Sequence, residues 1–312
     1  MGRHPSAARA YHRGVERESL GAFLRSRRGR VTPAQAGIAD YGTARRVPGL
    51  RREELAQLAG ISISYYIRLE QDQADGASEQ VLDALARVLR LDETEKVHLR
   101  NLARRRPAAT LTRPRPERVS PRVLALLDAL GESTPALVLG RRNDVLAWNR
   151  AGHALLTPHL DFAAPADAAA RPSLSRWFFL DPHARDLHRN WDDLAKSHVA
   201  YLRLVGGRHP GDARLAELIG ELTMRSREFA ALWAAGHVGD CTAGVKRLHH
   251  PTVGDLVVDY QVWLQPDSPD HRLEIYTAHD RPSSDALRLL TAQTPAPAPD
   301  RRRAGSEPRP AR

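Results

Sequence analysis

The residues with the clearest chemical pattern lie between positions 51 and 71. This stretch reads RREELAQLAGISISYYIRLEQ and has an apolar face on each side of Gly60. Glycine reaches the positive φ that a tight turn between two helices needs. Ser62 is a good N-terminal cap for the second helix, whose outward positions include Ile63, Ser64 and Arg68. Two short helices joined in this way are typical of a helix-turn-helix, whose second helix enters the major groove of DNA.

The charge distribution favours DNA binding over an ordinary helical hairpin with a solvated face. The chain has 312 residues and a net charge of +10. Residues 1–120 hold 23 basic and 14 acidic side chains, a net +9, whereas residues 121–293 hold 19 and 21, a net −2. Non-specific affinity for nucleic acid comes mainly from neutralising phosphates. A basic N-terminal segment followed by a near-neutral body therefore indicates a polyanion-binding module joined to a different kind of domain.

Hydrophobic periodicity predicts which elements position these residues. Helical patterns cover about 18–29, 52–59, 62–71, 78–91 and 92–105, so we expect an all-α domain over 18–106. A proline-rich linker follows at 107–121. The body, 122–293, begins with a helix at 122–130, strands at 136–139 and 145–148, and helices at about 175–188, 192–205, 213–224 and 227–235. It closes with strands at 244–249, 255–264 and 272–277 and a helix at 283–290. This order predicts an α+β domain with an antiparallel sheet, and we expect disordered ends at 1–17 and 294–312.

Longer strings of the sequence resemble a known family. RRVPGLRREELAQLAGISISYYIRLEQ, followed by SEQVLDALARVLRL, resembles the XRE (Cro-type) helix-turn-helix of actinobacterial regulators with an MmyB-like C-terminal domain. The second half is similar to that family in ALVLGRRNDVLAWNR, FLDPHARDLHRNW, GRHPGDARLAELIGEL, KRLHHPTVGDLVVDY and SSDALRLL. The resemblance covers about residues 18–292 and implies a five-helix DNA-binding domain followed by a PAS-like domain that binds a small ligand. Asp72 stands where the family usually has glycine, so the loop after the second helix is expected to be rebuilt.

The resemblance and the motif together select the residues expected at DNA. Arg68 is the strongest candidate for a base contact, because arginine can bind guanine with two hydrogen bonds. Arg51 and Arg52 open the first helix of the motif, where side chains meet phosphate. The predicted DNA-binding set is Arg51, Arg52, Ser62, Ile63, Ser64, Tyr65 and Arg68. Arg45 and Arg46 are candidates for contacts with the DNA backbone or the minor groove. The equally favoured alternative is that both lie in a solvated loop without contacting DNA.

The body offers aromatic residues for an apolar pocket and a few cationic anchors for an acidic head group. A mostly apolar ligand, such as a fatty-acyl compound, is the expectation that follows. For each aromatic residue the alternative is a place in the ordinary core. The predicted ligand-binding set is Trp148, Trp177, Phe178, Arg176, Arg247, His249, Tyr260 and Trp263.

Several other kinds of site are not expected. Cys241 is the only cysteine, which excludes an intramolecular disulfide and a cysteine-based zinc site. His249 and His250 are neighbours on a predicted strand and point to opposite faces, so they cannot easily hold one metal ion. No nucleophile, phosphate-loop or paired-carboxylate motif is found, so we expect no enzyme, no metal and no cofactor. No apolar run is long enough to span a membrane, and a cytoplasmic protein is expected.

The sequence thus predicts a sequence-specific, ligand-responsive transcriptional regulator that binds double-stranded DNA. A homodimer on a near-palindromic operator is expected, because paired helix-turn-helix units read two half-sites. Two alternatives remain open at this point. The body could be a protein-interaction or dimerisation module without a ligand, or an enzyme acting on a small molecule.

Overall fold

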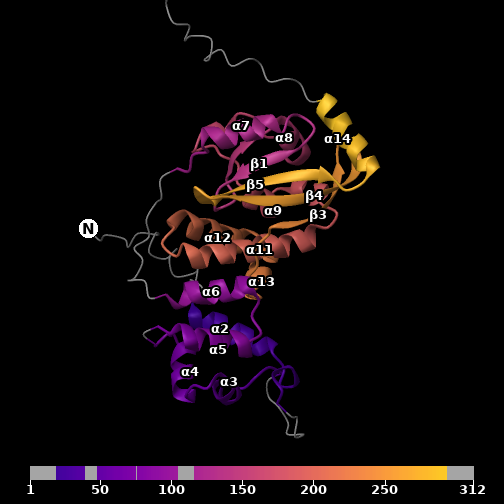
Figure 1. Ribbon diagram of the computed structural model, residues 1–312. Helices are drawn as coiled ribbons and strands as arrows, with labels where there is room; N and C mark the ends of the chain where they lie inside the picture. The colour runs from indigo at the N-terminus through magenta and orange to yellow at the C-terminus, as the bar shows by residue number, and fades with distance from the viewer. Residues whose placement is uncertain (1–18, 39–47, 75, 105–115, 294–312) are drawn as a thin grey trace, which may run out of the picture.

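The computed structural model describes residues 19–38, 48–74, 76–104 and 116–293. A helical head, residues 19–104, lies beside a larger body, residues 116–293, that contains the sheet (Figure 1). Both parts have the architecture expected from the sequence, an all-α head and an α+β body with an antiparallel sheet. None of the described helices is long and apolar enough to cross a lipid bilayer.

The head contains the five helices that the periodicity predicts. They are α2 (Leu20–Arg30), α3 (Arg52–Ala59), α4 (Ile63–Glu70), α5 (Glu79–Val88) and α6 (Glu93–Ala103). Hydroxyl or carboxylate side chains cap the starts of α4, α5 and α6: Ser62, Ser78 and Asp92 each accept from a backbone N–H three residues later. Gly60 ends α3 at a φ of +67°, the left-handed conformation that the turn of the motif requires.

Close backbone approach fixes the start of α2 against the end of α4. A Cβ added to Gly21 would lie 2.1 Å from the backbone oxygen of Glu70, whereas a Cβ on Gly29 of the same helix meets no atom within 4 Å. The backbone N–H of Gly21 also donates to the Asp72 carboxylate at 2.8 Å. Only glycine therefore fits at position 21, while position 29 accepts a side chain.

Gly21→Ala should destabilise the full-length protein by about 1–3 kcal/mol, because the packed backbone of α4 must move to admit the methyl group. Gly29→Ala is the matched control and should stabilise it by up to about 1 kcal/mol, since alanine is the better helix former. Urea unfolding followed by far-ultraviolet circular dichroism measures both changes. Equal stability of the two variants would contradict the close approach.

The body is built on one five-stranded antiparallel sheet with strand order β2-β1-β5-β4-β3. The strands are β1 (Ala136–Leu139), β2 (Val145–Trp148), β3 (Ala243–His250), β4 (Gly254–Gln265) and β5 (Ser268–Ala278). The helices are α7 (Pro121–Ala129), α8 (Arg150–Leu156), α9 (Leu174–Leu180), α10 (Pro182–Leu187), α11 (Trp191–Arg208), α12 (Ala213–Arg225), α13 (Arg227–Ala234) and α14 (Arg281–Gln293). The single helix predicted at 175–188 is two helices, because Asp181 caps α10 and Pro182 occupies its first turn.

Both faces of the sheet are covered. Helix α7 packs through Leu127 against Val138 and Ile275, which point to one face. Helices α9 and α11 cover the other face, and α12 and α13 pack beyond α11 (Figure 1). Residues 116–121, expected to be linker, belong to the body: the Glu117 side chain is buried and lies 3.5 Å from the Arg142 guanidinium.

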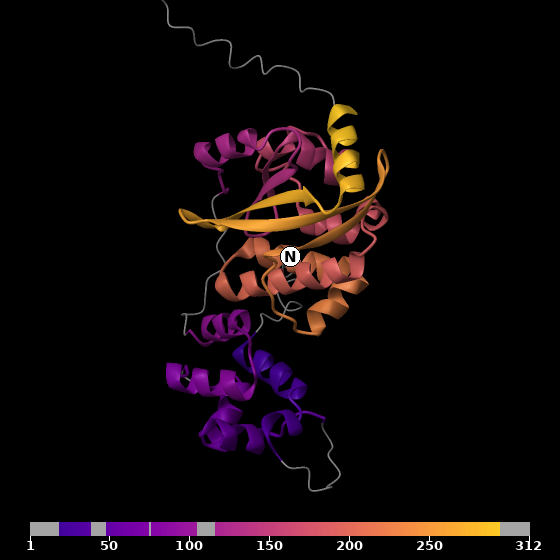
Figure 2. The same cartoon turned by 45° about the vertical axis from the view of Figure 1, so that its right-hand side comes forward.

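Head and body share one apolar cluster at their contact. Leu204 from the end of α11 and Val238 after α13 are buried with the core residues of the head. The Arg27 guanidinium on α2 donates to the backbone oxygen of Gly236 at 2.8 Å. Gly207 lies so close to the His98 ring that a Cβ there would be 2.6 Å from it. Figure 2 shows α2 and α6 of the head facing α11 and α13 of the body.

Candidate DNA-binding surface and ligand cavity

The second helix of the motif presents the predicted base-contacting side chains to the outside. Tyr66 and Leu69 on α4 are buried against the rest of the head. Ile63 is 43% exposed, and Ser64 and Arg68 are exposed on the opposite side of the helix. The uncovered face of α4 therefore carries the residue types that read base edges and thymine methyl groups.

Side chains of α4 also hold the loop that follows. The Tyr65 hydroxyl donates to the backbone oxygen of Gly76 at 3.1 Å, and Arg68 reaches the backbone oxygen of Gln73 at 3.4 Å. Asp72, where the sequence predicted a rebuilt loop, has a φ of +56°. It tolerates this left-handed conformation, and its carboxylate accepts from the backbone N–H of Gly21.

The first helix begins with two arginines in different surroundings. The backbone N–H of Arg51 donates to the Glu54 carboxylate at 2.7 Å. Arg52 donates through Nε to Glu70 at 2.7 Å, although half of its side chain remains exposed. Arg52 therefore has a structural partner in addition to the phosphate contact predicted for it.

Glu70 is fully buried between three donors. Arg28 Nε and the Tyr66 hydroxyl both donate to Glu70 Oε1 at 2.7 Å, and Arg52 Nε donates to Oε2. Burial alone would raise the pKa of Glu70, but the hydrogen bonds from Arg28, Arg52 and Tyr66 lower it below the usual value. This network ties α2, α3 and α4 together.

Arg45 and Arg46, the remaining DNA candidates, lie outside the described residues.

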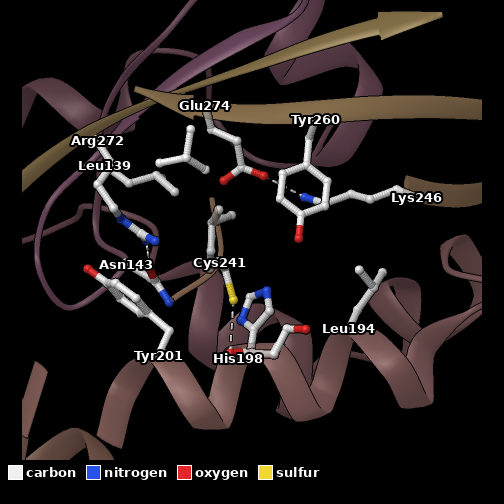
Figure 3. A pocket seen from close by; sticks show the side chains of 13 residues that line it. Leu139, Asn143, Leu194, His198, Tyr201, Cys241, Lys246, Tyr260, Arg272 and Glu274 are labelled. Atoms are coloured by element: carbon white, nitrogen blue, oxygen red, sulfur yellow. Dashed lines mark hydrogen bonds and ion pairs between the residues drawn. The ribbon is translucent and has the colours of Figure 1, made fainter. Parts of the chain in front are cut away.

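A cavity of about 40 Å³ lies between the sheet and α11 in the body (Figure 3). Its apolar wall includes Leu139, Leu174, Leu194 and Val262. More polar residues line it than the mostly apolar pocket predicted from the sequence would have. The polar and aromatic lining residues are Asn143, Ser197, His198, Tyr201, Cys241, Lys246, Tyr260, Arg272 and Glu274.

Lys246 and Glu274 form a buried ion pair on the sheet side of this cavity. Lys246 Nζ lies 2.8 Å from the Glu274 carboxylate and 2.8 Å from the Tyr276 hydroxyl, which also donates to Glu274. Burial opposes ionisation of Glu274, but the charge and hydrogen bond of Lys246 and the hydrogen bond from Tyr276 lower its pKa to about 2. Glu274 is thus ionised at neutral pH.

Two family models match the chain. A helix-turn-helix domain model matches residues 19–99, and the model of the MmyB-like transcription regulator ligand binding domain matches residues 119–290. The second match covers more than half of the sequence. This chain belongs to the MmyB-like transcription regulators. No curated protein matches it.

The cavity of this MmyB-like regulator differs from the ligand site predicted from sequence. Of the eight predicted residues only Tyr260 lines it. Trp148, Trp177 and Phe178 are buried in the core of the body, and the Trp148 indole N–H donates to the backbone oxygen of Phe162. Trp263 is 59% exposed near the end of β4.

The three predicted anchors do not reach the cavity. Arg176 pairs with Glu221 at 2.7 Å on the surface of the regulator. Arg247 and His249 occupy exposed positions of β3, whereas Lys246, Leu248 and His250 are buried. The alternation along the strand, which predicted that His249 and His250 point apart, therefore also places Arg247 on the outer face.

The same alternation could have revealed the residues that sequence reasoning missed. In AGVKRLHH, Lys246 shares its face with Leu248 and His250, so a lysine among apolar residues pointed inward. In HRLEIYT, Arg272, Glu274 and Tyr276 alternate with Leu273 and Ile275. The apolar members of that strand pack under α7, which leaves the polar members for the cavity side.

One further cluster of potential metal ligands lies at the start of α10 in this regulator. His159, Asp181 and His183 each offer an atom within 4.8 Å of the others. Asp181 accepts from the backbone N–H of His183 at 2.9 Å and lies 2.8 Å from its ring nitrogen. Capping of α10 and these hydrogen bonds account for the grouping, so we assign no site to it.

Proposed function

We propose that this MmyB-like regulator binds a near-palindromic operator as a homodimer through α4, in the cytoplasm, and that a ligand in the body changes its affinity for that operator. The observation that carries the proposal is helix α11. His198 and Tyr201 on this helix line the cavity, and Leu204, one turn further, is packed in the core of the head. A ligand that moves α11 would therefore act directly on the packing of α2 and α6.

The cavity favours a ligand-binding body over one that only binds another protein. The expectation of a mostly apolar ligand has support in the leucines of one wall. A long fatty-acyl chain would require this cavity to open, because its volume in the ligand-free protein is about 40 Å³. Any coupling between ligand and operator is expected to be about 1–3 kcal/mol, since it equals the difference in ligand affinity between the two conformations.

Arg68→Ala should cost about 1–3 kcal/mol of discrimination at one base position in each half-site, because Arg68 is exposed on the outward face of α4. Selection from a random operator library, followed by competition with non-specific DNA, measures the change. Arg68→Lys is the matched variant: it keeps the charge but loses the two-pronged geometry, so it should also lose discrimination. If Arg68→Lys restores binding to every sequence alike, Arg68 contacts phosphate and its assigned role is wrong.

A further inference from the structure

The hairpin that joins β4 to β5 has an exposed tip that is both apolar and acidic. Trp263 and Leu264 are 59% and 55% exposed and point to opposite faces of β4. Pro266 and Asp267 in the turn are exposed as well, and Asp267 forms no hydrogen bond or ion pair with the part of the chain that the structure describes. Figures 1 and 2 show this hairpin extending past the helices at one end of the body. Adjacent large apolar side chains in such a place are typical of a contact surface.

A groove of about 400 Å³ in the body offers apolar walls and two arginines. Its lining residues include Pro116, Arg118, Val119, Leu124, Leu146 and Arg171. Arg118 is exposed, and Leu124 on α7 is 40% exposed. The groove therefore presents uncovered apolar surface beside an uncovered cation.

The two arginines of the groove have no carboxylate partner among the described residues. Arg171 donates to the backbone oxygens of Pro165 and Glu117 at 3.0 and 2.8 Å. The Glu117 carboxylate lies beside Arg142 instead. Asp167, next to the groove, accepts from the backbone N–H of Ala169. The groove is thus complementary in charge and polarity to an apolar segment that ends in a carboxylate.

The tip and the groove lie at the same end of the sheet. Residues 116–119 lead directly into α7, and the Gln265 side chain at the base of the tip donates to the Ser120 hydroxyl at 3.3 Å. The head lies on the α11 side of the sheet (Figure 1). A twofold axis beside this end, along the direction from body to head, brings each tip to the groove of the other copy and keeps both heads on one side. A near-palindromic operator requires two heads placed in this way.

The edges of the sheet are covered, so pairing of edge strands does not offer a second copy an alternative contact. The backbone N–H of Val145 on β2 donates to the backbone oxygen of Pro172 at 2.8 Å. On β3 the Asn190 side chain donates to the oxygen of Val245 at 2.9 Å and accepts from the N–H of Arg247 at 3.0 Å. Edge groups that are already bonded in this way do not add a strand from another chain.

We propose that the β4–β5 tip of one copy docks in the groove of a second copy, and that the reciprocal contact closes the dimer. Leu264 packs against Leu124 of the other copy, and Asp267 pairs with Arg118. This inference rests on the proposed homodimer and names its contact surface. Because the twofold axis repeats every contact, a change at one residue acts on the dimer twice.

Sedimentation velocity of the full-length protein without DNA, over a range of concentrations, tests the contact. Asp267→Arg should raise the dimer dissociation constant about tenfold or more, because it brings like charges together at both contacts. Leu264→Ser should weaken the dimer to a similar extent without changing the charge. Arg118→Asp should also weaken it, whereas Arg118→Asp combined with Asp267→Arg should restore dimerisation, because the ion pair is rebuilt with its signs exchanged.

Two control variants separate the contact from general effects of charge and exposed surface. Asp186→Arg makes the same change of charge at an exposed position of α10, and Met224→Ser removes an apolar side chain that is 74% exposed at the end of α12. Both should leave the dissociation constant unchanged. Asp267→Arg and Leu264→Ser that dimerise like the parent protein, or a charge-exchanged double variant that stays as weak as its single variants, would overturn the proposed contact.

The failure of this contact and the failure of the proposed homodimer give different results. Native mass spectrometry on the operator obtained by library selection counts the copies bound. A parent protein and an Asp267→Arg variant that both bind as dimers would refute the contact and leave the homodimer standing. A parent protein that stays monomeric in solution and fills each half-site independently would refute both.

Discussion

Replacing Glu70 with glutamine should destabilise the head by about 3 kcal/mol or more and abolish operator binding. The Glu70 carboxylate is fully buried and accepts from Arg28, Arg52 and Tyr66. Removing one partner of a buried ion pair leaves charges and donors unpaired inside the protein, which is why the cost exceeds that of an exposed pair. Urea unfolding of the full-length protein, followed by far-ultraviolet circular dichroism, measures the loss.

A matched control separates this effect from a general loss of acidic charge. Glu53 lies on α3 and is exposed, so Glu53→Gln should change stability by less than about 0.5 kcal/mol. The five tryptophans, at positions 148, 177, 191, 233 and 263, all lie in the body. In Glu70→Gln the head should unfold at a lower urea concentration than the body. At that concentration the circular dichroism signal should therefore change more than the tryptophan fluorescence. An unaltered urea midpoint in that variant would show that the network contributes little.

Acid should destabilise the body well before its carboxylates are protonated. Burial, reinforced by the charge of Lys246, lowers the pKa of both His188 and His198 to about 3. In the unfolded chain a histidine has a pKa of about 6.5. Between pH 6.5 and 3 the unfolded state therefore binds more protons than the folded state. The stabilising effect is complete above pH 6.5 and is lost as pH falls, by up to about 1.4 kcal/mol per pH unit for each histidine.

Urea unfolding at pH 7.5, 6.5, 5.5 and 4.5, read by tryptophan fluorescence, measures this slope. His198→Phe should reduce it by one proton, and phenylalanine can keep the stacking of ring 198 on Phe178, whose centres are 4.5 Å apart. His183→Gln is the control, because His183 is exposed at the start of α10. If His198→Phe leaves the slope as steep as in the parent protein, His198 does not titrate between the two states as inferred.

Local patterns predicted most of the fold because the elements are locally consistent. The helix over 52–59, the turn at Gly60 and the cap at Ser62 follow from residue types a few positions apart, and the structure has all three. The strands and their antiparallel arrangement follow from alternation and element order. The helix predicted at 175–188 was wrong only at Asp181, where a cap and a proline override the apolar periodicity.

The ligand cavity could not be predicted to the same degree, because it depends on contacts between distant segments. Arg272 and Asn143 are 129 positions apart, and Lys246 and Glu274 meet only when β3, β4 and β5 are paired. Counting aromatic residues selected Trp148 and Phe178, which large buried surfaces place in the core. Strand alternation at Lys246 and Glu274 was the available signal, since inward charges are rare unless they are paired or bind a ligand.

The burial of Leu204 in the core of the head has a consequence for how such regulators can be recombined. In a chimaera that joins this DNA-reading head to the body of a relative at the proline-rich segment, the head would face a foreign last turn of α11. The core of the head would then lack the Leu204 side chain. Any residue other than glycine at position 207 would clash with the His98 ring. The boundary for exchanging domains therefore lies within α11 and not in the linker. A functional chimaera should need residues 204–207 and Val238 to come from the same protein as the head, because these residues contact the head.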